Sequence, residues 1–197
     1  MFSIIVLSRS EKMSNTTKSS LAASLKKLLE YKTLDRITIS DITNNCGINR
    51  QTFYYHFDDL AGLVEWMFND KISCIMRDLK LPDEWRKGLL MILQVLQEND
   101  SFVIQIYHSK INDRMYRFMF ETCLSFITEV SDADMRKGNI SRYDLEIAIR
   151  FFSYAFAGVM GEWFADDLRK PAERVAQRLG DIMETALPAV IRYYENS

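Results

Sequence analysis

Apolar residues recur with the roughly 3.6-residue period of an α-helix along most of this chain, and few residues that break helices interrupt them. The 197 residues include only 7 Gly and 3 Pro, so helices can extend over many turns. No segment shows the alternation of apolar and polar residues that a half-buried strand requires. The 10 Met and the aromatic residues, 12% of the chain, supply bulky side chains for packing between helices. The sequence therefore predicts an all-α protein.

Two short helices joined by a tight turn are predicted near the N-terminus. Thr38 and Asp41 have the spacing of a capping box, which predicts a helix that begins there and stops at Gly47. In the next helix, Phe53 and Phe57 lie four positions apart and therefore on one face. This pair of helices has the pattern of a helix-turn-helix.

The apolar spacing and the breaks divide the rest of the chain into further helices. Leucines at helical spacing predict a helix over 18–34 before the helix-turn-helix. After it, a helix capped by Asp58 or Asp59 is expected to run to about Leu79, ahead of Pro82. The chain then ends in five predicted helices, for a total of about nine: 83–98, 101–109, 113–131, 141–168 and 171–194.

Charge is unevenly distributed along the chain. The net charge of -2 at pH 7 argues against a nucleic-acid-binding protein, because such proteins usually carry an excess of basic residues. Residues 1–57, however, contain eight Lys or Arg and four acidic residues, a net charge of +4, so the remaining 140 residues carry -6. A basic segment attached to a larger acidic one suggests two tasks, of which only the first involves an anion.

The second helix of the helix-turn-helix carries the side chains that a DNA major groove requires. Arg50 can donate two hydrogen bonds to a guanine edge, Gln51 can pair with an adenine edge, and Tyr54 can contact a base or a thymine methyl group. The other polar residues of the segment can bind phosphates. The alternative is the solvated face of a small helical bundle. The predicted DNA-binding residues are Thr38, Ser40, Asn49, Arg50, Gln51, Thr52, Tyr54, Tyr55 and His56.

Three segments and one leucine carry a resemblance to a known family. They are 37–42 (ITISDI), 46–48 (CGI), 52–57 (TFYYHF) and Leu63. With this spacing, residues 18–67 resemble the DNA-binding domain of the tetracycline-repressor (TetR) family of bacterial regulators. The resemblance implies an all-helical homodimer that binds double-stranded DNA at a palindromic operator. It also implies a larger C-terminal domain for dimerisation and for an effector.

One residue departs from that family's pattern. Leu60 stands where the family usually has Lys, so we expect one phosphate contact fewer and a salt dependence shallower by about one unit of slope. Residues 50–57 and 63–66 also resemble a subgroup that includes activators of dihydroxyacetone kinase operons in Gram-positive bacteria. In that subgroup a partner protein related to the kinase brings the signal. Repression is the function that the family implies by default, and activation is the alternative.

The domain organisation follows from these segments. We expect an extension or disordered segment over 1–13, the helix-turn-helix domain over 14–60, and an effector-binding and dimerisation domain over 61–197. The last two helices are expected to form the dimer interface, because small residues there allow a partner helix to approach. Aromatic residues could form an apolar effector pocket or simply a helical core. The predicted pocket residues are Phe102, Tyr107, Phe118, Phe126, Tyr154 and Trp163.

Other classes of protein are disfavoured. His56 and His108 lie in no nucleophile motif, and the three Cys lack the spacing of a zinc site. We therefore expect no catalytic residue, no metal and no cofactor. The longest uncharged stretch, 151–161, is about half the length of a membrane span, so we expect a cytoplasmic protein without a membrane segment. A module that mainly docks another protein is a further alternative.

Overall fold

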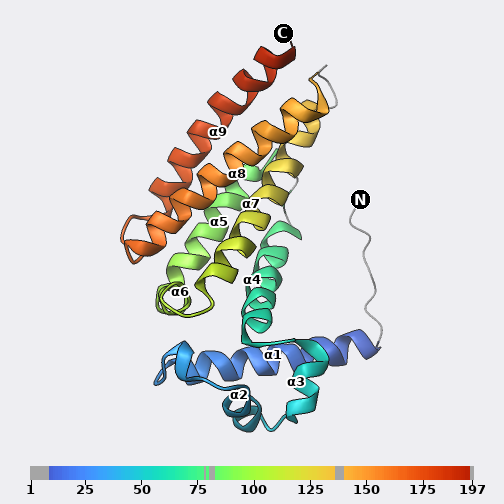
Figure 1. The fold of residues 1–197 in the computed structure, drawn as a ribbon, viewed down its shortest axis with the longest axis vertical. Coiled ribbons are helices and arrows are strands. Elements are labelled where there is room, and N and C mark those ends of the chain that lie inside the picture. Colours follow the sequence, from blue (N-terminus) through green and yellow to red (C-terminus); the bar gives the residue numbers. More distant parts are fainter. Residues whose placement is uncertain (1–8, 78, 80–82, 136–139, 196–197) are drawn as a thin grey trace. The chain divides into compact units, whose positions relative to one another are not determined.

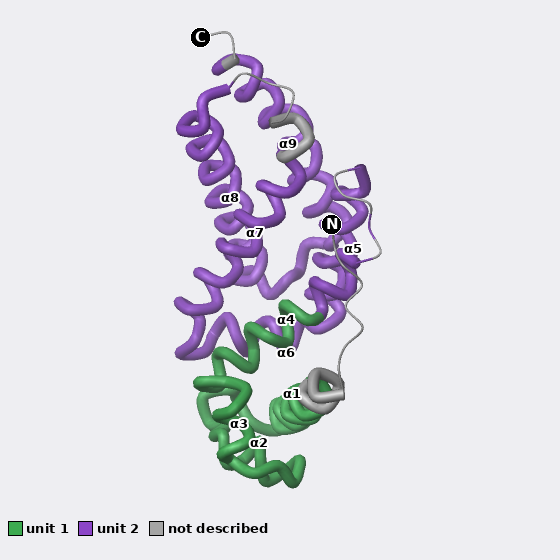
Figure 2. Tube along the Cα trace, turned by 90° about the vertical axis from the view of Figure 1, so that its right-hand side faces the viewer, with its two compact units in different colours: residues 1–70 green, residues 71–197 purple. Residues whose placement is uncertain are grey.

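The computed structural model describes residues 9–77, 79, 83–135 and 140–195. This part of the chain consists of α-helices and one short 3₁₀ helix, without strands, and confirms the all-α prediction (Figure 1). Two compact units, residues 1–70 and 71–197, divide the chain (Figure 2). The elements are α1 (Arg9–Leu29), η1 (Leu34–Arg36), α2 (Ile39–Cys46), α3 (Arg50–His56), α4 (Leu60–Arg77), α5 (Trp85–Glu98), α6 (Asp100–Tyr107), α7 (Asn112–Met135), α8 (Arg142–Ala165) and α9 (Ala172–Glu195).

The predicted bounds of the first helix, 18–34, are wrong at both ends. The polar run before Lys18 lies inside α1, where the Ser20 hydroxyl donates to the Thr16 carbonyl at 3.0 Å, and each Ser or Thr costs a helix only about 0.5 kcal/mol. At the other end the helix stops at Leu29. Leu34, which the apolar spacing assigned to this helix, lies instead in η1, where it is buried with 2% of its surface exposed. Residues 1–8 of the expected N-terminal extension lie outside the described residues.

The caps of the helix-turn-helix are those that the sequence predicts. The Thr38 hydroxyl accepts from the Asp41 amide at 3.1 Å, and the Asp41 carboxylate accepts from the Thr38 amide at 2.9 Å. Gly47 ends α2 with a φ of 68°, a left-handed conformation that a residue with a Cβ adopts only at a cost. The Asn49 side chain then accepts from the Gln51 amide and starts α3. Local sequence therefore determines where α2 ends and α3 begins.

The first unit has a core formed by the inward faces of its helices. α1 packs against α2 and α3. Phe53 and Leu63 are completely buried, so burial fixes the start of α4 and, together with the Asn49 cap, α3. Ser24 is also buried, and its hydroxyl donates to the Ile42 carbonyl at 2.7 Å while it accepts from the Asn45 side chain at 2.9 Å. This buried hydroxyl therefore both donates and accepts a hydrogen bond, as burial of a polar group requires.

The second unit is a bundle in which α7 packs along α8, α5 packs along α9, and α8 contacts α9. Its largest fully buried side chains include Trp163, Leu93, Ile127 and Met183. No helix of the described residues is both long enough and apolar enough to cross a membrane. The predicted boundaries at Pro82 and at residues 137–139 lie outside the described residues.

Polar contacts join α5 to α9 in this unit. Arg86 donates to Asp181 at 2.7 Å and to Glu184 at 2.6 Å. Its guanidinium lies so close to Gly180 that a Cβ there would come within 2.9 Å of it. The Gln97 side chain donates to two carbonyls of the loop before α9 and accepts from the first amide of that helix. These contacts fix the position of α9 along α5.

Candidate DNA-binding surface

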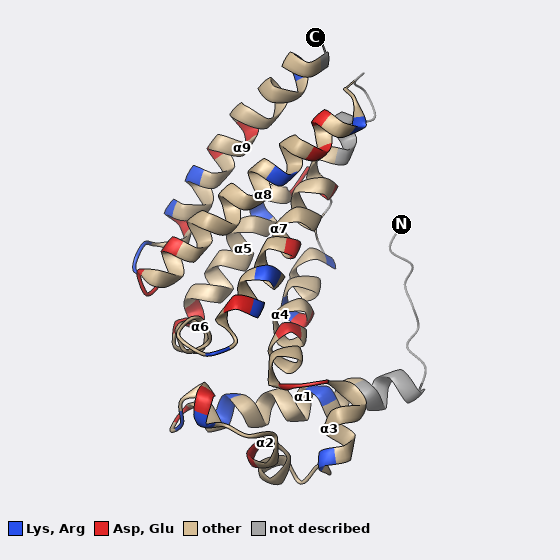
Figure 3. Cartoon of the chain, viewed as in Figure 1, with Lys and Arg blue, Asp and Glu red and all other residues tan. Residues whose placement is uncertain are grey.

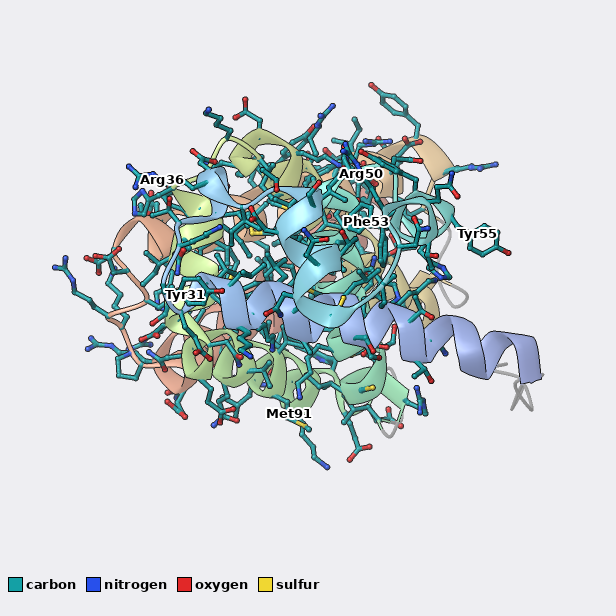
Figure 4. All side chains as sticks on the ribbon, turned by 90° about the horizontal axis from the view of Figure 1, so that it is seen from below. Tyr31, Arg36, Arg50, Phe53, Tyr55 and Met91 are labelled. Atoms are coloured by element: carbon teal, nitrogen blue, oxygen red, sulfur yellow. The ribbon has the colours of Figure 1, made fainter. Side chains whose placement is uncertain are left out.

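α3 buries one face and exposes another. Phe53 is completely buried, whereas Tyr54 is 46% and Tyr55 is 84% exposed. Arg50 and Gln51 are also exposed. Figure 4 views the molecule from below and shows Tyr55 projecting outward while Phe53 lies within the structure. The residues predicted to contact bases therefore lie on the accessible side of the helix.

Arg50 and Tyr54 contact each other on this surface. They lie four positions apart on the helix, and Arg50 Nη2 donates to the Tyr54 hydroxyl at 3.2 Å. The guanidinium carbon is 5.6 Å from the centre of the Tyr54 ring, within the range of a cation–π contact. From the sequence, each residue was predicted to contact DNA separately and this pair was not predicted, although the spacing of four positions permits it.

His56 lies at the end of α3 in a half-buried position. Burial lowers its pKa below the ordinary 6.5, and the nearby positive charge of Lys18 lowers it further. At neutral pH the ring is therefore uncharged and can donate one hydrogen bond. The Lys18 ammonium lies 6.0 Å from the ring centres of both Phe57 and Trp66. Sequence reasoning missed Lys18, because nothing in the sequence indicates that it lies beside residues so far along the chain.

The remaining predicted DNA-binding residues are tied to the caps or partly buried. Thr38 donates its hydroxyl proton to Asp41 at 2.9 Å. While the cap is intact, this hydroxyl therefore has no proton left to donate to a phosphate. The Asn49 carbonyl oxygen caps α3, which leaves its amide nitrogen as the donor for an anion. Ser40 and Thr52 are half-buried.

Hydrogen bonds also determine the acidity of Asp41 in the cap. The amide and hydroxyl of Thr38 and the ammonium of Lys32, 3.1 Å away, lower the pKa of Asp41 from 3.8 to about 2. The carboxylate is therefore ionised at neutral pH, where it holds the N-terminus of α2.

The chemistry of α3 suits a polyanion. Its sequence, RQTFYYH, contains no acidic residue, and in Figure 3 this helix has a segment coloured for Lys or Arg and none coloured for Asp or Glu. Its exposed groups are a guanidinium, a carboxamide and two phenol hydroxyls. All of them can donate hydrogen bonds to phosphates or base edges.

The six predicted pocket residues do not share one environment. Trp163 is 2% exposed, and its ring nitrogen donates to the Lys170 carbonyl at 2.9 Å. Tyr107 packs on Phe164, which stacks on Trp163.

The other four predicted pocket residues lie elsewhere in the unit. Phe126 packs on Trp85, with 6.4 Å between the ring centres. Tyr154 is 57% exposed and stacks on Phe120 with ring centres 4.2 Å apart, and Phe102 and Phe118 are half-buried. An open hollow of the described residues lies on α7 and is lined by none of these six; its residues are Glu121, Leu124, Ser125, Thr128 and Glu129.

Two further helices expose apolar side chains. On α8, Ile147 is 49% and Phe151 is 67% exposed. They share a face with Gly158, where a Cβ would meet no atom within 4 Å. On α9, Ile182 is 55% and Tyr193 is 69% exposed. Phe152 and Trp163, on the same helix as Ile147 and Phe151, are instead buried in the core.

Comparison with known proteins gives consistent results. The family model TetR_C_8, described as "Transcriptional regulator C-terminal region", matches residues 83–185. The HTH-type dhaKLM operon transcriptional activator DhaS of Lactococcus lactis is 28% identical over 141 residues, which cover 68% of this chain and 75% of that protein.

Solved structures show the same fold. A structure described as the dihydroxyacetone kinase operon activator DhaS has a TM-score of 0.67 at 23% identity, covering 91% of this chain and 98% of the other. A TetR transcriptional regulator from Rhodococcus sp. RHA1 has a TM-score of 0.56 at 16% identity, covering 90% and 99%.

Proposed function

This chain belongs to the TetR family of transcriptional regulators, and we propose that it binds a palindromic DNA operator as a homodimer, with α3 in the major groove. The observation that carries the proposal is the exposed face of α3, which offers hydrogen-bond donors and no acidic residue. An α-helix fits the major groove, where the base edges can be distinguished.

The side chains of this face have different tasks in the proposal. Arg50 reads a guanine and Gln51 reads an adenine, and Tyr54 lies beside Arg50 on the same face of the helix. Phosphate contacts fix the orientation of the helix and carry no sequence information directly. They come from Tyr55 and His56, and from the polar groups of Ser40, Asn49 and Thr52. Thr38 joins them only when its hydroxyl proton turns from Asp41 to a phosphate.

The apolar faces of α8 and α9 support a homodimer. Ile147, Phe151 and Gly158 lie on one side of α8, and Ile182 and Tyr193 follow the same helical spacing on α9. A twofold dimer places two copies of α3 on one duplex and requires a palindromic site, with half-sites about 34 to 36 Å apart if they are separated by one helical turn.

Regulation would act through the helical second unit. An effector molecule, or a partner protein loaded with one, shifts the population of dimers toward one spacing of the two α3 helices if it binds that form more tightly. α4 contributes residues to both units and is the natural element to transmit the change. We place the protein in the cytoplasm, where the operator is accessible.

The protein can regulate transcription in one of two directions, repression or activation. Repression is the default that the family resemblance implies. Activation is supported by the likeness to DhaS, which is named as an activator of the dhaKLM operon. Transcripts next to the bound site should rise when the gene is deleted if the protein represses, and fall if it activates.

Selection of duplexes from a random DNA pool tests the proposal. The purified protein at near-physiological salt should enrich a palindrome, and Arg50→Ala should lose the preference at one base pair in each half-site. Arg169→Ala, in an exposed loop of the second unit, serves as the control and should select the same palindrome. A folded wild-type protein that enriches no sequence, alone or with cell extract as a source of effector, would contradict DNA binding and favour a docking module.

A further inference from the structure

We propose that Tyr54 is a positioning residue that orients Arg50 for one base pair, so that its contribution to sequence preference acts through Arg50. The inference rests on the proposed function, because it concerns the same face of α3. It differs from the sequence-based interpretation, in which Tyr54 touches a base by itself.

Two contacts join the side chains. Arg50 Nη2 donates to the Tyr54 hydroxyl at 3.2 Å, and the guanidinium carbon lies 5.6 Å from the ring centre. The Tyr54 hydroxyl holds Nη2 of Arg50, and the Tyr54 ring contacts the planar guanidinium. Together they restrict both the position and the tilt of the guanidinium, which a single hydrogen bond would not do.

Tyr54 is itself held in place by the core. Its ring packs edge-on against Phe53, with 5.7 Å between the ring centres and 84° between the planes. Phe53 has no exposed surface, whereas Tyr54 is 46% exposed. Tyr54 therefore joins a rigid interior to a long, exposed arginine. Its neighbour Tyr55 is 84% exposed and contacts the ring of His56 instead.

This geometry matters because a free arginine samples many rotamers. Ordering it on DNA costs conformational entropy, and restraint before binding reduces that cost. The Tyr54 hydroxyl accepts only one of the several N–H donors of the guanidinium, so a pair of donors remains for the two acceptors of a guanine edge. An arginine held in one orientation also fits a wrong base less well than one that can move.

A set of matched variants tests the inference: Tyr54→Phe, Tyr55→Phe, Arg50→Ala, Arg50→Lys and the double variant Arg50→Ala/Tyr54→Phe. Affinities are measured for the selected palindrome and for every symmetric single-base change in it. Phenylalanine keeps the ring and its packing on Phe53 and removes only the hydroxyl. Circular dichroism verifies that each variant is folded.

The inference predicts that the variants converge on one base pair. Arg50→Ala identifies that pair by lowering discrimination there about 5- to 150-fold. Tyr54→Phe should lower discrimination at the same pair about 2- to 10-fold and should have no further effect there in the double variant. Arg50→Lys, which breaks the contact from the other side, should also lose discrimination there. Tyr55→Phe, which removes a proposed phosphate contact, should weaken binding to all sequences alike and change discrimination at no position.

Other outcomes overturn the inference. If Tyr54→Phe alters the preference at a different base pair, Tyr54 reads DNA directly. If it weakens binding to all sequences equally, Tyr54 contacts a phosphate. These results leave the proposed function intact. By contrast, if the wild type selects no DNA, or if Arg50→Ala changes discrimination at no position, the proposed α3 contacts fail and the role of Tyr54 fails with them.

Discussion

α3 and α8 each bury one face, but their exposed faces differ in chemistry. The exposed side of α3 carries Arg50, Gln51 and two tyrosines, all of which can donate hydrogen bonds. The exposed side of α8 carries Ile147 and Phe151, which gain only by removal from water. Hydrogen-bond donors on a helix surface can bind the phosphates and base edges of DNA. An exposed apolar stripe is typical of a surface that binds another protein. We interpret the two faces as separate surfaces, one for DNA and one for a second copy of the chain.

A charge in the apolar stripe should have the largest effect. Phe151→Glu places a carboxylate where the proposed dimer excludes water, and burial of an unpaired charge is strongly unfavourable. We expect a folded monomer by sedimentation. Its operator affinity should fall by about 10²-fold or more, because each α3 then binds without the gain of a linked second contact.

A matched change outside the stripe controls for this prediction. Met91 on α5 is also an exposed apolar residue, 36% accessible, and Met91→Glu should remain dimeric and bind DNA normally. A dimeric Phe151→Glu protein would show that the exposed apolar side chains of α8 do not form the interface.

Removal of the buried hydroxyl in the first unit should have an intermediate effect. Ser24→Ala takes away the donor to the Ile42 carbonyl and the acceptor for Asn45, and should lower the free energy of unfolding by about 1 to 3 kcal/mol. Urea unfolding measures the change. Ser19→Ala, at an exposed position of the same helix, should be nearly neutral. Equal stabilities for the two variants would mean that the hydroxyl network does not hold α2 against α1.

The capping box should give a smaller effect that depends on pH. Because its partners lower the pKa of Asp41 from 3.8 to about 2, its ionised form stabilises the fold above pH 3.8 and this contribution disappears as the pH falls through 2. Asp41→Asn should therefore be less stable than the wild type at neutral pH, with a difference that shrinks in acid. Asp58→Asn is the control, because Asp58 is exposed and the side chain that accepts from the Gly62 amide at the start of α4 is that of Asp59. A difference that is independent of pH would contradict the capping role.

The smallest predicted effect is a dependence of operator affinity on the protonation of His56. It concerns the DNA-binding surface of α3 and not the apolar stripe of α8. In the free protein, burial and Lys18 hold the pKa of His56 below 6.5, whereas a phosphate beside it would favour the protonated ring. Operator affinity should therefore rise as the pH falls below 6.5, by at most about tenfold per pH unit for one proton. His56→Gln should remove this rise and His108→Gln should retain it. The same pH profile in the wild type and His56→Gln would place His56 away from phosphate.

The sequence predicts the helix-turn-helix well because local chemistry determines it. Thr38, Asp41 and Gly47 form the cap and the turn through neighbours in the chain, and Phe53 points inward as its spacing requires. The bounds of α1 were mispredicted for two separate reasons, one at each end. Its polar N-terminal run is compatible with a helix, and the apolar Leu34 is buried by tertiary packing in η1.

The second unit was harder to interpret residue by residue, since residue type does not reveal whether an aromatic side chain points inward. Trp163 and Tyr154 were both predicted to line a pocket, yet one is 2% and the other 57% exposed. Their surroundings depend on how helices distant in sequence pack together. The same reason explains why Lys18, beside Phe57 and Trp66, was not foreseen.

The number of chains bound to each operator duplex tests the central claim most directly, because it requires both surfaces at once. Sedimentation of a fluorescent duplex carrying the selected palindrome, titrated with the wild-type protein, should show two chains per duplex. A duplex with one scrambled half-site should bind far more weakly. Saturation at one chain per duplex, or equal affinity for the palindrome and the scrambled site, would contradict recognition by a homodimer through its two α3 helices.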